Sequence, residues 1–217
     1  MIKLIVNPNE FFSELKCKDL RIKKPLLTIV LPLAVILSMY QYLLINKLLQ
    51  VFPKEVAQFL TIGAYISIIG SFIGIFAVWL IIAVVMHGIS SFFNATGNFR
   101  RTFEFTGYGF LPSLVGAIVT TPISYHYISQ AQLPKIPLTQ LVQNPSIAKT
   151  LISGLLPKTL IYSNLLINLV LTAWSLTIWT FAIKHAREIE LKKAFITALI
   201  PTILFGAYQI WNLLKIL

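Results

Sequence analysis

The chain has few charged residues and only one cysteine. Of its 217 residues, 12% are Asp, Glu, Lys or Arg, against ~25% in an average soluble domain. A single cysteine, Cys17, can form neither an intramolecular disulfide nor a cysteine-rich metal site. The composition therefore argues against a water-soluble globule and against a disulfide-stapled secreted domain.

Acidic residues are the scarcest charged class, and they avoid the apolar stretches of the chain. The seven are Glu10, Glu14, Asp19, Glu55, Glu104, Glu188 and Glu190. A proton-coupled carrier needs a titratable group inside the membrane, and many enzymes carry a nucleophile elbow, a phosphate-binding glycine loop or an HExxH motif. The sequence has none of these features, so we predict neither a carboxylate-driven transporter nor an enzyme, and no cofactor.

Long uncharged runs dominate the rest of the chain. Apolar residues make up 57% of it, and five runs without charge cover residues 25–46, 56–99, 105–134, 159–183 and 194–214. About 20 helical residues, at ~1.5 Å each, cross a ~30 Å hydrocarbon core, and lipid does not tolerate an unpaired strand edge. The predicted fold class is therefore all-α, a polytopic membrane bundle of five transmembrane helices near 26–46, 58–86, 106–125, 160–183 and 194–214.

The distribution of basic residues predicts the orientation of this bundle. Run 56–99 is long enough for two crossings, so five and six spans must be compared. With five spans and the N-terminus inside, 12 of the 18 Lys and Arg residues are inner, whereas six spans leave 10 inner and 8 outer. The positive-inside rule thus favours five spans in the cell membrane, with the C-terminus outside. We expect the net charge of +11 to bind anionic lipid headgroups rather than nucleic acid.

The predicted organisation is a basic N-terminal segment, 1–24, followed by a membrane domain, 25–217, whose outer loop covers 126–158. Within the N-terminal segment, Asn7, Pro8 and Glu10 have the spacing of an N-cap, a first-turn proline and a third-position acid. This pattern predicts a short amphipathic helix. It either lies in the headgroup layer or belongs to a solvated basic leader.

A polar stripe marks the fourth predicted span. Its residues are Asn164, Asn168, Thr172 and Ser175, which share one helix face, and Gln209 on the last span is an expected partner. Amides left in lipid are costly, so the stripe should face the bundle interior. Two interpretations remain open: interhelical hydrogen bonds that hold the bundle together, or a polar cleft for a small solute or lipid.

Two other patterns allow both a structural and a functional interpretation. Gly70-x-x-x-Gly74 permits close helix approach, expected within the bundle, with a homo-oligomer contact as the alternative. His87, His185 and Glu188 could be drawn as a metal site, but histidines at helix ends often contact only water or terminal carbonyls. We therefore predict no resident metal.

Four short motifs carry a resemblance to a known family. They are GNFRRTFE followed by GYGFLP over 97–112, Asn7-Pro8 with Phe11-Phe12, the pair Trp174 and Trp179, and Lys193-Ala194. Together they resemble the Yip family, named for Rab/Ypt-interacting proteins. The resemblance implies a five-span, N-inside, non-enzymatic membrane protein. Eukaryotic members have longer N-terminal regions and act with Rab GTPases in trafficking, so the 24 residues before the first span indicate a prokaryotic-type member.

The predicted inner face suggests how such a protein could act. It carries a mixed set of charges that we take as candidates for partner binding: Arg100, Arg101, Glu104, Arg187, Glu188, Lys192 and Lys193. These residues either dock a cytoplasmic protein or anchor helices to headgroups, and Arg100 and Glu104 are expected to pair at i, i+4. The leading hypothesis is recruitment or bilayer shaping through this face. The alternative is a channel or transporter that uses the polar cleft.

Overall fold

The computed structural model describes residues 1–135 and 157–214, and every regular element in these ranges is a helix. The elements are α1 (Ile2–Val6), α2 (Pro8–Lys16), α3 (Lys23–Pro25), the π-helical turn η1 (Leu26–Val30), α4 (Leu31–Leu49), α5 (Lys54–Ser91), α6 (Phe99–Tyr108), α7 (Leu111–Gln130), α10 (Lys158–Arg187) and α11 (Leu191–Leu214). Most of the predicted outer loop, residues 136–156, lies outside the described residues.

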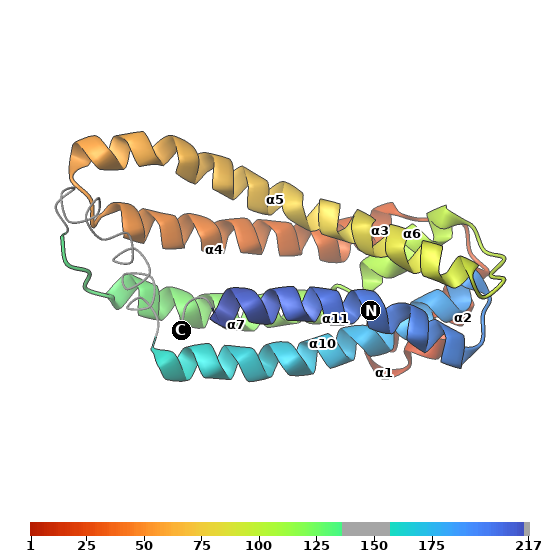
Figure 1. The fold of residues 1–217 in the computed structure, drawn as a ribbon. Coiled ribbons are helices and arrows are strands. Elements are labelled where there is room, and N and C mark those ends of the chain that lie inside the picture. Colours follow the sequence, from red (N-terminus) through yellow and green to blue (C-terminus); the bar gives the residue numbers. More distant parts are fainter. Residues whose placement is uncertain (136–156, 215–217) are drawn as a thin grey trace.

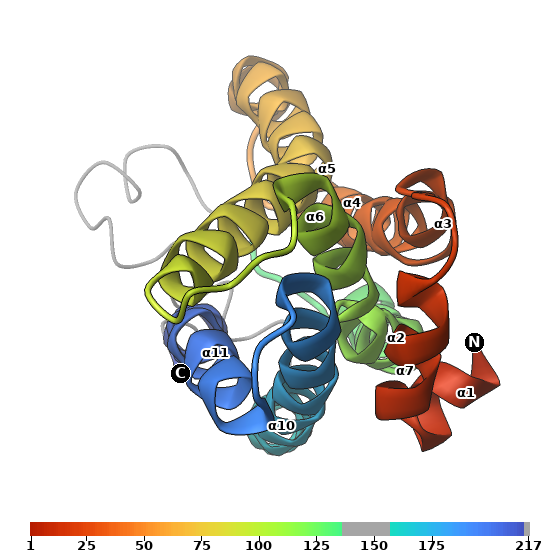
Figure 2. The same cartoon turned by 90° about the vertical axis from the view of Figure 1, so that its right-hand side faces the viewer.

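The long helices α4, α5, α7, α10 and α11 run lengthwise in one bundle, and the short helices gather at one end of it (Figure 1). We call this end the polar cap and define it as residues 1–25, 86–108 and 184–193. The N-terminal helices and α6 face the viewer when the bundle is seen from this end (Figure 2). Twelve of the 18 basic and six of the seven acidic residues belong to the polar cap. The segments predicted to be inner therefore lie together in space.

Within the described ranges, four helices are long and apolar enough to cross a membrane: Lys23–Leu49, Val56–Ser91, Lys158–Arg187 and Leu191–Trp211. They overlap the first, second, fourth and fifth predicted spans. The uncharged run 56–99 contains one continuous helix, because α5 extends without a break over 38 residues. At ~1.5 Å per residue α5 is about 57 Å long, so it exceeds the hydrocarbon thickness and reaches into the polar cap.

The third predicted span is the exception. A single helix over 106–125 is wrong, because α6 ends at Tyr108 and α7 begins at Leu111. The last turn of α6 closes with Gly109 N–H donating to the Thr106 carbonyl at 3.1 Å. Pro112 then occupies the first turn of α7, where its missing N–H costs no helix hydrogen bond. The chain thus turns between a helix of the polar cap and a helix of the bundle.

Packing is concentrated at the capped end. The largest fully buried side chains there include Trp179, Tyr108, Phe12, Phe105 and Phe110, which belong to one continuous core with Met86. At the opposite end, the buried residues Ile128, Ile161 and Val51 form two small separate clusters. Over residues 1–135 and 157–214, the capped end is therefore more densely packed than the far ends of the helices.

Candidate functional site: a polar cap and an uncharged cavity

Helix α6 lies at the centre of the polar cap and is fixed from three sides. Asn98 caps its first turn, because the Asn98 Oδ1 accepts from Arg101 N–H at 2.9 Å. Trp79 of α5 donates its indole N–H to the Phe103 carbonyl at 2.9 Å, and Trp179 of α10 donates to the Thr106 carbonyl at 2.9 Å. Two long helices thus hold α6 through hydrogen bonds to its backbone. The sequence motifs include Trp179 but give no indication that Trp79 contacts α6.

Two glycines of the GNFRRTFE–GYGFLP motif allow this close packing. A Cβ placed on Gly97 would lie 1.8 Å from the Ala186 carbonyl oxygen of α10. A Cβ placed on Gly109 would lie 1.9 Å from the indole nitrogen of Trp179. Both distances are far below van der Waals contact. Glycine is therefore required at these two positions of the motif for the chain to pack this closely against α10.

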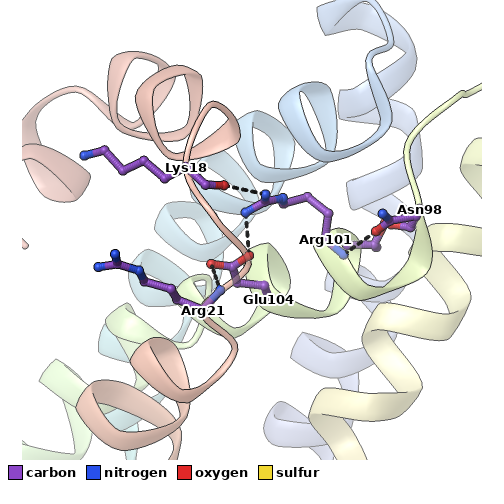
Figure 3. A network of polar contacts seen from close by, with 6 residues as sticks. Lys18, Arg21, Asn98, Arg101 and Glu104 are labelled. Atoms are coloured by element: carbon purple, nitrogen blue, oxygen red, sulfur yellow. Dashed lines mark hydrogen bonds and ion pairs between the residues drawn. The ribbon is translucent and has the colours of Figure 1, made fainter.

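A buried carboxylate joins the N-terminal segment to α6 (Figure 3). Glu104 is 0% exposed and accepts from the Arg101 Nη1 at 2.8 Å and from the Arg21 backbone N–H at 3.2 Å. Arg101 also donates to the Lys18 carbonyl at 2.7 Å. Burial raises the pKa of Glu104, outweighing the Arg21 N–H and the Arg101 guanidinium, which lower it. The predicted ion pair between Arg100 and Glu104 is wrong. Glu104 pairs instead with Arg101, at i, i+3, and Arg101 also reaches the N-terminal segment.

The turn between α10 and α11 is tied into the polar cap in the same way. Arg187 is 4% exposed and donates through Nε to the Ser90 hydroxyl at 2.8 Å. Glu188 has a left-handed backbone, φ 56°, and its carboxylate accepts from Lys16 at 2.7 Å and from the Thr96 hydroxyl at 2.9 Å. The hydrogen bonds from Lys16 and Thr96 hold the pKa of Glu188 below its usual range. These contacts connect α2, the 92–98 loop and the turn.

The seven candidate docking residues therefore divide into two sets. Arg101, Glu104, Arg187 and Glu188 make contacts within the polar cap, and the burial of Glu104 and Arg187 removes them from any docking surface. Arg100 and Lys192 are exposed, and Lys193 is partly exposed, 3.9 Å from Glu190. Sequence position alone did not distinguish these sets, because the internal partners come from distant segments.

The three residues considered as a candidate metal site, His87, His185 and Glu188, contact different partners. His87 Nδ1 lies 3.1 Å from the Thr102 hydroxyl, and His185 Nε2 lies 2.9 Å from the Asn9 side-chain oxygen. Glu188 contacts Lys16, as described above. Over residues 1–135 and 157–214, no group of three or more His, Cys, Asp and Glu side chains is arranged to hold a metal ion.

A cavity of about 530 Å³ lies between the long helices, away from the polar cap. Its polar lining residues are Tyr40, Ser71, Ser113, Thr120, Thr121, Ser124, Asn164, Asn168, Thr172, Ser175, Tyr208 and Gln209. All five residues predicted for a polar cleft are in this set. The apolar part of the wall includes Leu33, Leu37, Ile75, Val78, Ile167, Leu171 and Phe205.

Gly70 and Gly74 lie on the α5 wall of this cavity. A Cβ added to either glycine would meet nothing within 4 Å. The expectation that this pair packs against another helix of the same bundle is therefore wrong. The short side chains widen the cavity, because α4 and α11, the neighbours of α5, do not approach these two positions.

Comparison with known proteins agrees with these observations. The model of the Yip1 domain matches residues 2–212, from α1 through α11. The chain belongs to the Yip1 family. It is also similar to an uncharacterized protein of the archaeon Methanocaldococcus jannaschii, 40% identical over 135 residues that make up 61% of this chain and 95% of the relative. No solved structure matches. The resemblance drawn from the motifs is confirmed, and the Yip1 family is not an enzyme family.

Proposed function

We propose that this Yip1-family protein is a non-enzymatic, five-span protein of the cell membrane that recruits a cytoplasmic partner through its polar cap. The observation that carries the proposal is the construction of the polar cap. Its buried charges hold α2, α6 and the α10–α11 turn together, while Arg100 and Lys192 are left exposed on that framework. A rigid surface with exposed basic residues suits a partner with an acidic surface.

The arrangement of the helices supports five spans with the N-terminus inside. With 20 residues, α7 is about 30 Å long at ~1.5 Å per residue, so it can accompany the four apolar helices across the bilayer. An odd number of crossings places the polar cap and the end of α11 on opposite sides, as in the bundle (Figure 1). The concentration of basic residues in the polar cap favours its inner position.

Exposed apolar residues on the polar cap support contact with the headgroup layer. Ile2 and Val6 of α1 are 79% and 77% exposed, and Phe92 in the turn after α5 is 87% exposed. Apolar side chains next to lysines are typical of segments that lie in a membrane interface and bind anionic lipid. We infer that α1 rests on the inner leaflet and that bilayer contact accompanies partner binding.

The orientation can be tested with the native cysteine. Cys17 is exposed on the polar cap, so a membrane-impermeant maleimide should label wild-type protein only in inside-out vesicles. Gln132→Cys in a Cys17→Ser background should be labelled only in right-side-out vesicles. Reversal of both patterns would contradict the orientation, and labelling of both sites from one side would contradict five spans.

Partner recruitment can be tested by cross-linking in native membranes. Arg100→Glu with Lys192→Glu should abolish capture of any partner that depends on the basic surface, because the charge reversal repels acidic groups. The matched control is Lys54→Glu with Lys158→Glu, at the other end of the bundle. Recruitment is supported by a protein lost in the first variant and kept in the control. Equal capture by both variants at equal abundance contradicts it.

The transport alternative rests on one observation, the gathering of Asn164, Asn168, Thr172, Ser175 and Gln209 on one cavity wall. A cavity supports binding, whereas transport also needs access from both sides. Transport is therefore the second hypothesis. It is tested by flux into proteoliposomes with Asn164→Leu and Asn168→Leu variants, which should block a polar pathway.

A further inference from the structure

We infer that the cavity between the long helices binds one uncharged lipid through its glycerol or carbonyl region. The inference rests on the membrane-spanning arrangement proposed above and not on partner recruitment. Five helices contribute to the wall, and the ligand is identified by the chemistry of that wall.

No charged side chain is found in the wall over the residues that the structure describes. The 23 described lining residues are apolar, small, hydroxyl-bearing or amide-bearing, and none of them is Asp, Glu, Lys, Arg or His. A phosphate or ammonium group placed there would lose its hydration without gaining an ion pair, which is strongly unfavourable. The ligand group in the cavity is therefore neutral.

Amide groups in the wall offer hydrogen bonds to such a ligand. Over the described ranges, the side chains of Asn164 and Gln209 have no hydrogen-bond partner, and Asn168 uses only its Nδ2, which donates to the Asn164 carbonyl at 2.9 Å. Each amide carries both donors and an acceptor. Hydroxyl and ester or ether oxygens match this set, and they occur together in the glycerol region of a lipid.

The size and surroundings favour a lipid over water or a polar solute. A volume of about 530 Å³ is many times the ~30 Å³ that one water occupies in the liquid, so the cavity has room for a glycerol region and the beginning of an acyl chain. The apolar wall residues Leu33, Leu37 and Val78 suit that chain. Around the cavity, α5 exposes Ile66 and Ile73 on its outer surface. Lipid is therefore the solvent at this depth, and it is the molecule available to enter.

Glycine substitutions provide a specific test. Gly74→Leu places a side chain into open space on the cavity wall, so it fills the cavity without a clash in the helix packing. Gly63→Leu is the matched control, because a Cβ there also meets nothing within 4 Å but Gly63 does not line the cavity. Asn168→Leu replaces the amide by an apolar group with the same number of heavy atoms and the same branching. The probes are dioleoylglycerol, which is uncharged, and dioleoylphosphatidic acid, which is anionic.

Native mass spectrometry of the purified protein in detergent micelles measures the bound lipid. We expect one dioleoylglycerol per wild-type and Gly63→Leu chain and at least tenfold weaker binding to Gly74→Leu and Asn168→Leu. Dioleoylphosphatidic acid should bind the basic polar cap, to the same extent in all four proteins. Equal binding of dioleoylglycerol to the Gly63 and Gly74 variants would overturn the inference. Dioleoylphosphatidic acid binding that Gly74→Leu weakens to the same extent would also overturn it, because the cavity would then accept a charged group. So would a wild-type dimer lost only in Gly74→Leu, which would make the wall an interface between copies. Partner capture by Gly74→Leu should be normal, so this test and the recruitment test fail independently.

Discussion

Replacement of Gly109 by alanine should destabilise the polar cap specifically. The added methyl group would lie 1.9 Å from the indole nitrogen and 2.1 Å from Cδ1 of Trp179. Trp179 cannot move aside easily, because it is 0% exposed and packs edge-on against Phe110 and Phe205. The indole N–H also holds the Thr106 carbonyl at 2.9 Å. The substitution therefore forces either the indole or the α6–α7 turn to shift.

The expected cost combines two contributions. Overpacking of a well-packed core costs about 1–3 kcal/mol. Loss of the indole hydrogen bond leaves a buried donor and a buried carbonyl, at about 1–3 kcal/mol. Together Gly109→Ala should lower the free energy of unfolding by about 2–6 kcal/mol, provided that the two effects add.

Thermal unfolding of the purified protein in detergent, followed by tryptophan fluorescence, measures this effect. The control is Gly88→Ala, which lies on α5 at the same end of the bundle and has nothing within 4 Å of the added Cβ. In a helix, alanine is more favourable than glycine by about 1 kcal/mol, so Gly88→Ala should unfold at the wild-type temperature or above. If both variants unfold together, the close approach of Gly109 to Trp179 does not determine stability.

Three further outcomes follow from the contacts of the polar cap. Glu104→Ala should release the N-terminal segment and increase tryptic cleavage after Arg21 at least tenfold in samples with the same folded fraction. Glu104→Gln keeps an acceptor, so it should show a smaller increase. Unchanged cleavage in both variants would contradict the role of Glu104 in holding the N-terminal segment. Because the pKa of Glu188 is lowered in the folded protein, its stabilising effect is present above the unfolded pKa and lost as acidification passes the folded pKa. The hydrogen-exchange protection factors of α2, which compare each rate with the intrinsic rate at the same pH, should fall on acidification in wild type and less so in Glu188→Gln. Trp79→Phe should cost about 1–2 kcal/mol in thermal unfolding through the freed backbone carbonyl of α6, and a wild-type melting curve would refute that bond.

Local sequence signals predicted the features that depend on a few neighbouring residues. Asn7 accepts from the Glu10 N–H at 3.1 Å and α2 begins at Pro8, as the capping pattern indicated. The four residues Asn164, Asn168, Thr172 and Ser175 share one helix face because their spacing fixes their direction whatever surrounds them. These predictions required only the geometry of a single helix.

Features that depend on distant segments could not be obtained in this way. Arg101 rather than Arg100 pairs with Glu104 because it also reaches the Lys18 carbonyl, a contact across 83 residues. The helix predicted for the third span is interrupted at 109–110, where α6 packs against Trp79 and Trp179. A hydropathy pattern contains no information about these contacts. Small residues at Gly70 and Gly74 permit helix contact without requiring it, so the motif gave no information on what lies opposite.

The unequal packing of the two ends has a mechanical consequence. The large buried side chains hold the long helices together at the polar cap, while the described residues of the far ends share two small clusters. Helices joined in this way behave like the arms of a clamp whose pivot is the polar cap. Their far ends can separate through small changes of angle, with no rearrangement at the pivot, since local opening follows low contact density. The volume between the arms can therefore vary while the surface that carries Arg100 and Lys192 keeps its shape.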